Sequence, residues 1–449
     1  MMNSEELKTP IYDFVKEYAE KNGTRLHMPG HKGRGALGVE SLDITEISGA
    51  DVLYSADGII AESEDFASRL FGTHHSFYST QGSTLAISAM LRLATRDAEN
   101  PMVLAARNVH RSFISAAALL DLDVEFLYPS SACHLCACPI SASDVESALS
   151  ESEKKFSAVY ITSPDYLGNV ADVKGIAEVC KKHEIPLLVD NAHGAYLKFL
   201  PEDMHPITLG AAMCSDSAHK TLPVLTGGAY LHVSKDYPEY AEGAREALSL
   251  FASTSPSYLT LASLDLCNKK LSEDYPSALS GLLAKVSDVK ASLSTLGFAI
   301  ECGEPLKIVI NAARCGFEGV ELSEILRKNG IEAEFADREY LVLMPTPENS
   351  DEDFEKLVNA LNGVLKNGNT CESKPSPTIS QHERVTSIRR AVFSPSETLS
   401  VRDAVGRVCA SPTVSCPPAV PIVVSGEKIT EDDVFVFEYY GIEKIAVLK

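Results

Sequence analysis

Two ionisable residues, Asp190 and Lys220, have the types and the spacing to take part in a cofactor site. Asp190 follows the short apolar run Pro186–Val189, which predicts a strand buried on both faces of a parallel sheet. Open α/β sheets bind ligands outside the carboxyl ends of their strands, so this carboxylate is expected at a ligand-binding edge. Lys220 precedes a second strand-like run, Gly228–Val233. An amine for a Schiff base and an anion beside a ring nitrogen are what pyridoxal phosphate needs from a protein.

The same two residues also fit a plainer interpretation. Many strands end in an aspartate, and a lysine in a loop is usually a solvated charge. The pair therefore indicates a cofactor site only in combination with other motifs.

A phosphate-binding turn is one such motif. The stretch Phe77–Ala86 predicts a turn that opens a helix running through Met90 and Leu93. Gly82, Ser83 and Thr84 would place free backbone N–H groups, two hydroxyls and the positive end of the helix dipole together, which is how a phosphate is held. Serine and threonine also cap ordinary helices, so the tripeptide alone is weak support.

The N-terminal region offers groups for a substrate. The segment Leu26–Gly33 is too rich in glycine and proline for regular structure, and it contains His27, His31 and Lys32. It is either a turn with incidental charges or a segment laid over an active site. Residues 43–62 form either a solvated acidic loop or an edge that meets a cationic side chain; their acids are Asp43, Glu46, Asp51, Asp57 and Glu62.

Strands alternate with helices from about residue 75 to residue 235, which predicts an α/β fold with a doubly wound, mostly parallel sheet. Besides Pro186–Val189, strands are expected at 102–105, 124–128 and 157–162, and a helix at 170–182. Of the residues that would follow strands, His110, Ser163 and Asp190 are expected at one edge of this sheet.

The remaining chain suggests several domains. We expect an N-terminal helix and active-site segment at 1–40, a large cofactor-binding domain at 41–245 and a helical connection at 246–295. A small α/β domain at 296–368 and a linker at 369–382 follow. The chain then ends in a compact C-terminal appendage at 383–449.

Composition narrows the function classes. The formal net charge of −22 argues against nucleic acid as a partner and mildly favours a cationic substrate. No apolar run is long enough for a transmembrane helix and no apolar leader begins the sequence, so we expect a cytosolic protein without a membrane partner.

The 11 cysteines are scattered, mostly within apolar segments, which is typical of reduced thiols. Cys133, Cys136 and Cys138 are spaced as metal ligands can be, but no second cluster completes a zinc site. The sequence therefore predicts no metal site, and these cysteines are expected in a variable surface loop.

With these motifs assembled, the sequence resembles the Orn/Lys/Arg decarboxylase family of fold-type-I pyridoxal phosphate enzymes, in its shorter, Gram-positive-like form. The resemblance covers nearly the whole chain. It rests on the stretches 27–33 (HMPGHKG), 43–46 (DITE), 82–84 (GST), 107–112 (RNVHRS), 161–164 (ITSP), 188–194 (LVDNAHG), 217–223 (SAHKTLP), 254–258 (TSPSY), 404–407 (AVGR) and 417–418 (PP).

The resemblance implies pyridoxal 5′-phosphate as cofactor, with roles for particular residues. Lys220 would form the Schiff base, Asp190 would pair with the pyridine nitrogen, and His110 would stack on the ring. The remaining cofactor-binding residues would be Gly82, Ser83, Thr84, His193, Ser217 and His219, with His219 also counted as catalytic. Thr254 and Ser255 would reach the phosphate of a neighbouring subunit, so a homodimer would be the smallest active form.

The implied reaction is decarboxylation of arginine, lysine or ornithine to the corresponding amine, a step in polyamine biosynthesis. His27, His31, Lys32, Asp43, Glu46 and Asp337 are the expected substrate-binding residues, with Glu46 and Asp337 favoured for the distal cation. Around the substrate end and the appendage the chain departs from the family pattern, at Asp51–Tyr54, Asn191, Cys416 and Ala419. Two alternatives therefore stay open: a cofactor-binding protein without decarboxylase activity that serves a regulatory or partner role, and another reaction on the Schiff base, such as transamination.

Overall fold

The computed structural model describes residues 8–130, 135–367, 377–378, 380–414 and 420–449. The chain divides into two compact units, each assembled from several segments. Unit 1 comprises 1–104, 152–163 and 173–276, and unit 2 comprises 105–151, 164–172 and 277–449. The domain boundaries expected from the sequence stay predictions.

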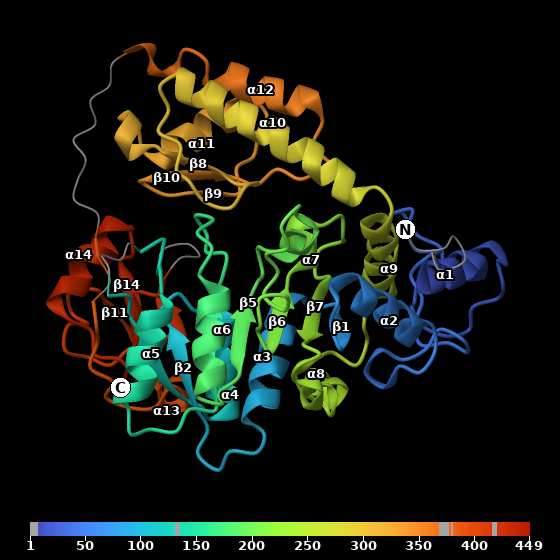
Figure 1. The fold of residues 1–449 in the computed structure, drawn as a ribbon, viewed down its shortest axis with the longest axis horizontal. Coiled ribbons are helices and arrows are strands. Elements are labelled where there is room, and N and C mark those ends of the chain that lie inside the picture. Colours follow the sequence, from blue (N-terminus) through green and yellow to red (C-terminus); the bar gives the residue numbers. More distant parts are fainter. Residues whose placement is uncertain (1–7, 131–134, 368–376, 379, 415–419) are drawn as a thin grey trace. The chain divides into compact units, whose positions relative to one another are not determined.

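Helices and strands alternate through both units (Figure 1). The α-helices are α1 Pro10–Glu20, α2 Ile59–Phe71, α3 Gly82–Thr95, α4 Arg111–Leu120, α5 Ala142–Glu151, α6 Val173–Lys182, α7 Ala218–Thr221, α8 Ala244–Phe251, α9 Tyr258–Ser272, α10 Tyr275–Thr295, α11 Gly319–Lys328, α12 Asp351–Leu361, α13 Ile388–Phe393 and α14 Glu431–Tyr439. The strands are β1 His75–Ser79, β2 Met102–Ala106, β3 Asp123–Leu127, β4 Ala158–Thr162, β5 Leu187–Asp190, β6 Met213–Asp216, β7 Ala229–Val233, β8 Ile308–Asn311, β9 Phe335–Ala336, β10 Tyr340–Leu343, β11 Ser396–Ser400, β12 Thr413–Val414, β13 Val423–Val424 and β14 Lys444–Leu448.

Seven strands form the large sheet, in the order β1-β7-β6-β5-β4-β2-β3. β5 pairs in parallel with β4 and with β6, and all four of its residues are buried. An apolar strand of this kind needs cover on both faces, which helices on the two sides of a doubly wound sheet supply. The predicted α/β class, with its large and mostly parallel sheet, is confirmed.

One edge of this sheet differs from the prediction. The stretch His75–Ser79 was expected to lie partly in a turn, but it forms β1, which pairs antiparallel with β7. β7 in turn pairs antiparallel with β6. The serines of β1 gave it the appearance of a turn, but its last four residues are all buried. Strand pairing in the sheet satisfies their backbone groups, so a polar sequence can occupy this position.

Local signals set most of the helix ends. Proline stands at the first position of α1, where its fixed φ suits a helix start and its missing N–H costs no bond. α12 begins with a capping box in which Ser350 and Asp353 exchange hydrogen bonds. α6 begins at Val173, slightly later than predicted.

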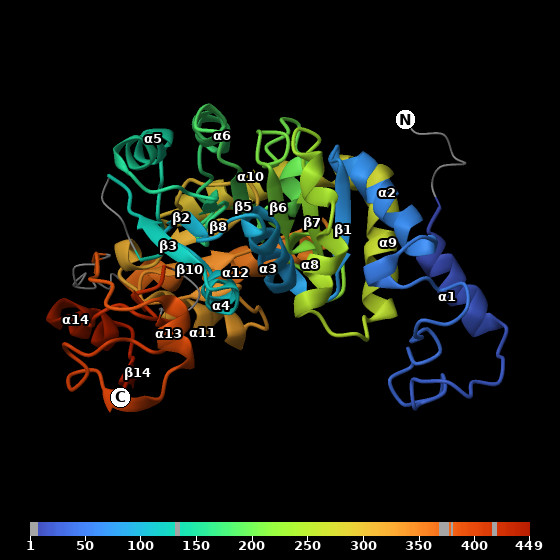
Figure 2. The ribbon, with the colours of Figure 1, turned by 90° about the horizontal axis from the view of Figure 1, so that it is seen from below.

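Helices α1, α2 and α9 pack on one another beside β1 (Figure 2). A buried carboxylate, Asp265 of α9, joins them. One of its oxygens accepts the N–H groups of Ile11 and Tyr12, and the other accepts the Ser63 hydroxyl. Because Asp265 also satisfies two of the donors that α1 leaves open at its start, it fixes this N-terminal helix to unit 1.

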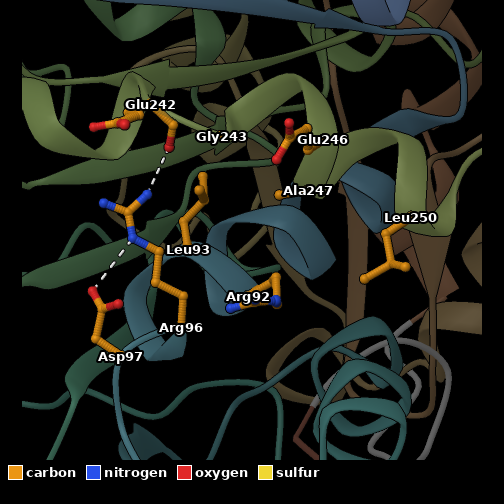
Figure 3. A pocket seen from close by; sticks show the side chains of 9 residues that line it. All are labelled: Arg92, Leu93, Arg96, Asp97, Glu242, Gly243, Glu246, Ala247 and Leu250. Carbon is orange, nitrogen blue, oxygen red and sulfur yellow. Dashed lines mark hydrogen bonds and ion pairs between the residues drawn. The ribbon is translucent and has the colours of Figure 1, made fainter.

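The C-terminal end of α3 lies beside the start of α8, and the two helices form the walls of a polar groove (Figure 3). Arg96 donates across it to the backbone oxygens of Glu242 and Glu239. The groove is lined by Arg92, Leu93, Arg96, Asp97, Glu242, Gly243, Glu246, Ala247 and Leu250.

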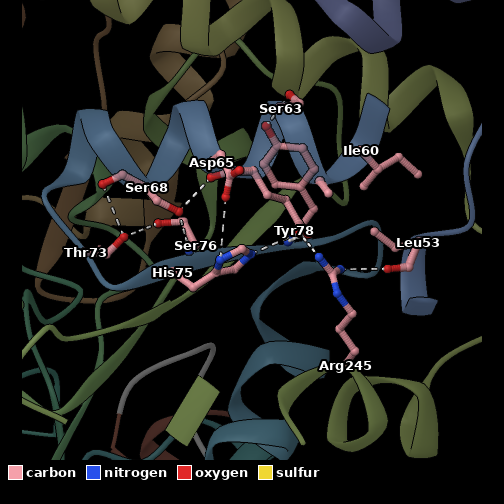
Figure 4. A network of polar contacts seen from close by, with 12 residues as sticks. Leu53, Ile60, Ser63, Asp65, Ser68, Thr73, His75, Ser76, Tyr78 and Arg245 are labelled. Atoms are coloured by element: carbon pink, nitrogen blue, oxygen red, sulfur yellow. Dashed lines mark hydrogen bonds and ion pairs between the residues drawn. The ribbon is translucent and has the colours of Figure 1, made fainter. Parts of the chain in front are cut away.

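Another buried carboxylate, Glu64 of α2, ties β1 to α8 (Figure 4). It accepts the Tyr78 N–H at 2.9 Å and the Arg245 guanidinium at 2.6 Å, and it lies 3.2 Å from the His75 ring. Arg245 also donates to the Leu53 carbonyl at 3.0 Å. This interaction compensates a charge that would be costly to bury alone.

Unit 2 contains a three-stranded sheet in the order β8-β10-β9. Part of its core is made by Cys136 with Leu167, Val309 and Val342. The expectation that Cys136 and Cys138 lie in a surface loop is therefore wrong, since both are buried. Each thiol fills apolar space as a small hydrophobic side chain does. Cys133 and Cys416 lie outside the described residues.

Unit 2 also contains a fully buried arginine, Arg107, at the end of β2. Its guanidinium donates to both carboxylate oxygens of Glu427, at 2.6 and 2.9 Å, and to the carbonyl of Ile422 at 3.1 Å. It also stacks on the ring of Phe126, 4.7 Å from its centroid. This ion pair joins the segment before His110 to the C-terminal part of the chain.

No helix in the described part of the chain combines the length and the apolar character that crossing a membrane requires.

We predict that Arg107→Ala lowers the free energy of unfolding of unit 2 by about 3–5 kcal/mol, because it leaves the Glu427 carboxylate buried without a counter-charge. Urea denaturation measures the loss. The matched control is Arg402→Ala, since Arg402 pairs with Glu438 at 2.6 Å but its side chain is 74% exposed. That substitution should cost at most about 1 kcal/mol. Equal losses in the two variants would contradict the importance of the buried pair.

Candidate active site

The parallel register of β5 and β6 brings the main candidates together. Asp190 at the end of β5 lies opposite Ser215 of β6, and the chain then continues through Ser217 into the short helix α7, which carries His219 and Lys220. All of these residues belong to unit 1. Asp190 and Lys220, distant along the chain, therefore lie at the same carboxyl edge.

Asp190 is buried, with only 2% of its surface exposed. One carboxylate oxygen accepts the Ala192 N–H at 3.1 Å, and the other accepts the Tyr160 hydroxyl at 3.3 Å. Burial and the charge of Asp190 raise the pKa of Tyr160 well above its ordinary value, so this hydroxyl keeps its proton and acts as a donor. The two donors hold the carboxylate in one orientation.

Lys220 contacts a histidine from the neighbouring strand end. Its Nζ lies 3.0 Å from Nε2 of His193, which is buried. His193 follows β5 in the same turn as Asp190, so the amine, the imidazole and the carboxylate occupy one region of unit 1. An amine positioned by an imidazole has the groups needed to attach a carbonyl compound and to exchange protons with it.

The predicted phosphate-binding residues also meet. Ser83 Oγ at the start of α3 lies 2.6 Å from Ser217 Oγ. Gly82 has a φ of +69°, which favours glycine, and its N–H bonds to the Gly227 carbonyl at 2.7 Å. His219 Nδ1 lies 2.9 Å from the Gly228 carbonyl. No side chain caps α3, so the N–H groups that follow Gly82 in its first turn are available to an anion.

Four other cofactor candidates take no part in these contacts. His110 belongs to unit 2, where its ring caps α4 by accepting the Ser112 N–H. Thr254 and Ser255 are exposed residues between α8 and α9, and Thr84 is exposed at the start of α3. The structure therefore does not bring all the predicted cofactor residues into one described cluster.

The N-terminal candidates form two pairs of contacts. His31 Nε2 lies 3.1 Å from an oxygen of Asp43, and its other ring nitrogen accepts the Gly33 N–H. His27 Nε2 lies 2.7 Å from the Tyr18 hydroxyl, and Lys32 donates to the His27 carbonyl. The segment is thus held by its own polar contacts.

The acidic candidates differ in whether their carboxylate oxygens already have hydrogen-bond donors. Asp51 accepts backbone N–H groups that include those of Val52, Gly58 and Ile60, so its carboxylate caps the start of α2. These donors hold its pKa below the usual value, although partial burial opposes them. Glu46 is exposed, and no other described residue forms a hydrogen bond or ion pair with it.

Asp337 lies in unit 2, buried, with its carboxylate already bonded. It accepts the N–H groups of Glu339 and Tyr340 at 2.8 and 2.6 Å, and the Cys136 thiol at 3.3 Å. Burial raises its pKa. This geometry fits a carboxylate that stabilises the turn between β9 and β10.

Sequence reasoning missed Tyr160 and Tyr54. Tyr160 was expected only as part of a strand, but the alternation of side chains places it on the face that carries Asp190, since Thr162 pairs with Asp190 in the parallel register. Tyr54 has a buried hydroxyl with no hydrogen-bond partner among the described residues. A strand position two residues from an edge could have identified Tyr160; no local signal identifies Tyr54.

The groove of Figure 3 is separate from these residues. It lies at the C-terminal end of α3, whereas Gly82 and Ser83 begin that helix. A helix of 14 residues is roughly 20 Å long, so the groove does not form part of the candidate site.

Two family models match most of this chain. A family model described as "Orn/Lys/Arg decarboxylase, major domain" matches residues 9–309, and one described as its C-terminal domain matches residues 368–444. Arginine decarboxylase of Bacillus subtilis is 28% identical, with 95% of this chain and 92% of the relative covered. Arginine decarboxylase of Halalkalibacterium halodurans is 29% identical, with 96% and 93% covered.

Among solved structures, the lysine decarboxylase of Francisella novicida superposes with a TM-score of 0.82. Its sequence identity is 17%, and the match covers 99% of this chain and 81% of that protein. At this identity the likeness establishes the fold alone.

We predict that Tyr160→Phe lowers the free energy of unfolding of unit 1 by about 1.5 kcal/mol, because the buried Asp190 carboxylate loses a hydrogen bond to a charged group. Denaturation of the two proteins measures the difference. Tyr240→Phe is the matched control, since no other described residue bonds to the Tyr240 hydroxyl, and it should change stability by less than about 0.5 kcal/mol. A Tyr160→Phe protein as stable as the control would show that the contact contributes nothing.

Proposed function

Because this chain belongs to the Orn/Lys/Arg decarboxylase family, we propose that it decarboxylates arginine to agmatine and carbon dioxide with pyridoxal 5′-phosphate. The family establishes decarboxylation of a basic amino acid. Arginine is the choice supported by the relatives, because several that match at least 93% of this chain are named arginine decarboxylase.

The residues at the carboxyl edge fit the cofactor. The uncapped start of α3, with Ser83 and Ser217, suits its phosphate. Lys220 supplies the amine that binds its aldehyde carbon covalently, and His193 orients that amine. Asp190 supplies the buried anion for its ring nitrogen. The observation that carries the proposal is the meeting of the Lys220 amine, the His193 ring and the Asp190 carboxylate in one unit.

When bound, pyridoxal phosphate provides an electron sink for the electrons that the departing carboxylate leaves behind. Asp190, held in place by Tyr160 and the Ala192 N–H, would pair with the protonated ring nitrogen and so preserve that sink. The Lys220 amine, which the substrate amine displaces, is then in place to return a proton to the substrate α-carbon. Burial of Asp190 and His193 excludes water from these groups.

We further propose that Glu46 binds the guanidinium of arginine. Its carboxylate is exposed and unpaired among the described residues, whereas those of Asp51 and Asp337 are occupied by backbone N–H groups. Burial and, as a smaller cause, the charge of Glu46 raise the pKa of the Tyr54 hydroxyl to about 12, so this hydroxyl keeps its proton. Among the described residues it has no hydrogen-bond partner. Together, Glu46 and Tyr54 offer an anion and a polar group to a cation.

The family match is what supports the roles proposed for His110, Thr254 and Ser255. His110 would stack on the cofactor ring. Thr254 and Ser255 are exposed, which is what a contact to the phosphate of a second subunit requires. The smallest active form in this proposal is therefore a homodimer.

We predict that the purified protein converts arginine to agmatine, and that borohydride attaches the cofactor to Lys220. Lys220→Ala should form no covalent adduct and no agmatine, while Lys198→Ala, which removes an amine paired with Asp203, should keep both. Mass spectrometry of the reduced protein and of the products measures both. Lysine and ornithine are offered in parallel. A keto acid in place of an amine would indicate transamination, and no product from any of the three substrates would contradict the proposal.

The distal site has its own prediction. Glu46→Gln should raise the arginine KM roughly 30-fold or more, since an unpaired substrate cation costs about 2–5 kcal/mol. Its effect on citrulline, an uncharged analogue of similar length, should be small. Asp337→Asn should change both substrates equally, because its carboxylate serves the β9–β10 turn. Steady-state kinetics with the two substrates provides the test, and equal losses in Glu46→Gln would exclude Glu46 as the residue that binds the guanidinium.

A further inference from the structure

A cluster of potential metal ligands lies on the opposite face of the same sheet edge. Side chains alternate along a strand, so Asp190 and Ser215, which are paired in the register of β5 and β6, share one face. Cys214 and Asp216 therefore point to the other face. His232 of β7 pairs with Cys214 and joins them there.

His205, from the loop before β6, completes the cluster. His205, Asp216 and His232 each offer a ligand atom, and these atoms all lie within 4.8 Å of one another. His205 Nε2 is 3.0 Å and His232 Nε2 is 3.3 Å from the same oxygen of Asp216. Cys214 Sγ lies 3.9 Å from His205 Nε2 and 3.8 Å from the other Asp216 oxygen.

These separations are close to those of a tetrahedral shell. Zinc binds nitrogen, oxygen and sulfur at about 2.0–2.3 Å, which places neighbouring ligand atoms about 3.3–3.6 Å apart. The Asp216 oxygen lies 3.0 and 3.3 Å from the two histidine nitrogens. Cys214 Sγ, at 3.8 and 3.9 Å from its neighbours, lies outside this group of three and would have to move inward on binding. Two imidazoles, a carboxylate and a thiolate are also a ligand set that favours zinc over magnesium or calcium.

The orientation of His232 points to a ligand at the centre of the cluster. Its Nδ1 lies 2.8 Å from Ser76 Oγ, which in turn contacts the Thr73 hydroxyl (Figure 4). This contact occupies Nδ1 and directs the other ring nitrogen at the cluster. There the buried Nε2 lies 3.3 Å from Asp216 without hydrogen-bond geometry.

The surroundings of the cluster resemble those of a closed metal site. His205, Cys214, Asp216 and His232 have no exposed surface. Phe71 packs on the rings of His205 and His232, at 5.5 and 4.4 Å between centroids. Asn191 donates to the second Asp216 oxygen at 2.7 Å, and Ser76 supports His232. Such outer contacts orient the ligands of bound metals.

We propose that His205, Cys214, Asp216 and His232 bind one structural zinc ion. Zinc with one carboxylate and one thiolate is neutral overall, which suits a fully buried position. The ion would fasten β6 to β7 and to the loop that carries His205. Asn191, which follows Asp190, donates to Asp216, so the ion would also fix the end of β5. It would therefore stabilise, from the opposite face of the sheet, the edge that carries Asp190 and Lys220.

The first experiment measures metal content in the full-length protein with its cofactor bound. Protein loaded with Zn²⁺ and dialysed against metal-free buffer should retain about one zinc per chain, measured by elemental analysis. His232→Gln and Asp216→Asn should retain less than a tenth of that amount. The matched control His74→Gln, at an exposed histidine next to β1, should retain the wild-type amount. A wild-type protein without zinc, or ligand variants that keep it, would overturn the proposal.

A second variant separates loss of metal from loss of folding. Ser76→Ala removes the support of His232 without removing a ligand, and it should weaken zinc affinity about 10–100-fold. The helical signal in circular dichroism should stay unchanged. Wild-type affinity in a folded Ser76→Ala protein would count against the assigned orientation of His232.

Cobalt provides a spectroscopic test of the ligand set. Co²⁺ added to the metal-free wild-type protein should give the intense visible bands of tetrahedral cobalt, at longer wavelengths than the absorption of the cofactor. Cys214→Ser should lose the thiolate contribution to the spectrum, and Cys180→Ser, at a buried cysteine of α6, should not. An octahedral cobalt spectrum in the wild type would refute a closed four-ligand site. None of these readouts depends on decarboxylase activity.

Discussion

The parallel pairing of β5 with β6 is the constraint on which the rest of this protein depends. It sets Asp190 opposite Ser215, and the next residues of the chain then deliver Ser217, His219 and Lys220 to the same edge. A register shift of one residue would turn Asp190 to the other face of the sheet and separate it from Tyr160. Both faces of β5 are buried, so such a shift would also expose apolar side chains or bury polar ones.

The alternation of side chains gives this edge two chemically distinct faces. Asp190 and Ser215 lie on one face, whereas Asn191, Cys214, Asp216 and His232 lie on the other. Buried polar groups are costly without a partner, and on the two faces Tyr160 bonds to Asp190, Asn191 bonds to Asp216 and Ser76 contacts His232. The polar groups on one face therefore help to fix the strands, and this also positions the side chains on the other face.

Elsewhere in the chain, buried ion pairs also fix the positions of strands and helices. Glu64 joins β1 to α8 through Arg245, and Arg107 joins the end of β2 to the C-terminal part of unit 2 through Glu427. Each charge is compensated only when distant segments are correctly placed, so each pair favours one arrangement over looser ones. Acids that form no such ion pair, such as Glu46, keep a carboxylate that can still bind a cation.

The sequence by itself determined the fold class, the family and the chemistry of the edge. These follow from local patterns: a continuous apolar run before Asp190, a Gly-Ser-Thr helix start at 82–84, and a lysine in the SAHK motif at 217–220. Tertiary structure decided what each of the 62 acids does, because the role of a carboxylate depends on which distant N–H groups reach it. The sequence left Asp51 and Asp337 as candidates for substrate binding, whereas in the structure backbone N–H groups occupy their carboxylates. The sequence also predicted a turn in part of β1, which instead pairs with β7. The cluster of His205, Cys214, Asp216 and His232 has no recognisable spacing in the chain, since strand register and a loop, rather than sequence distance, bring its members together.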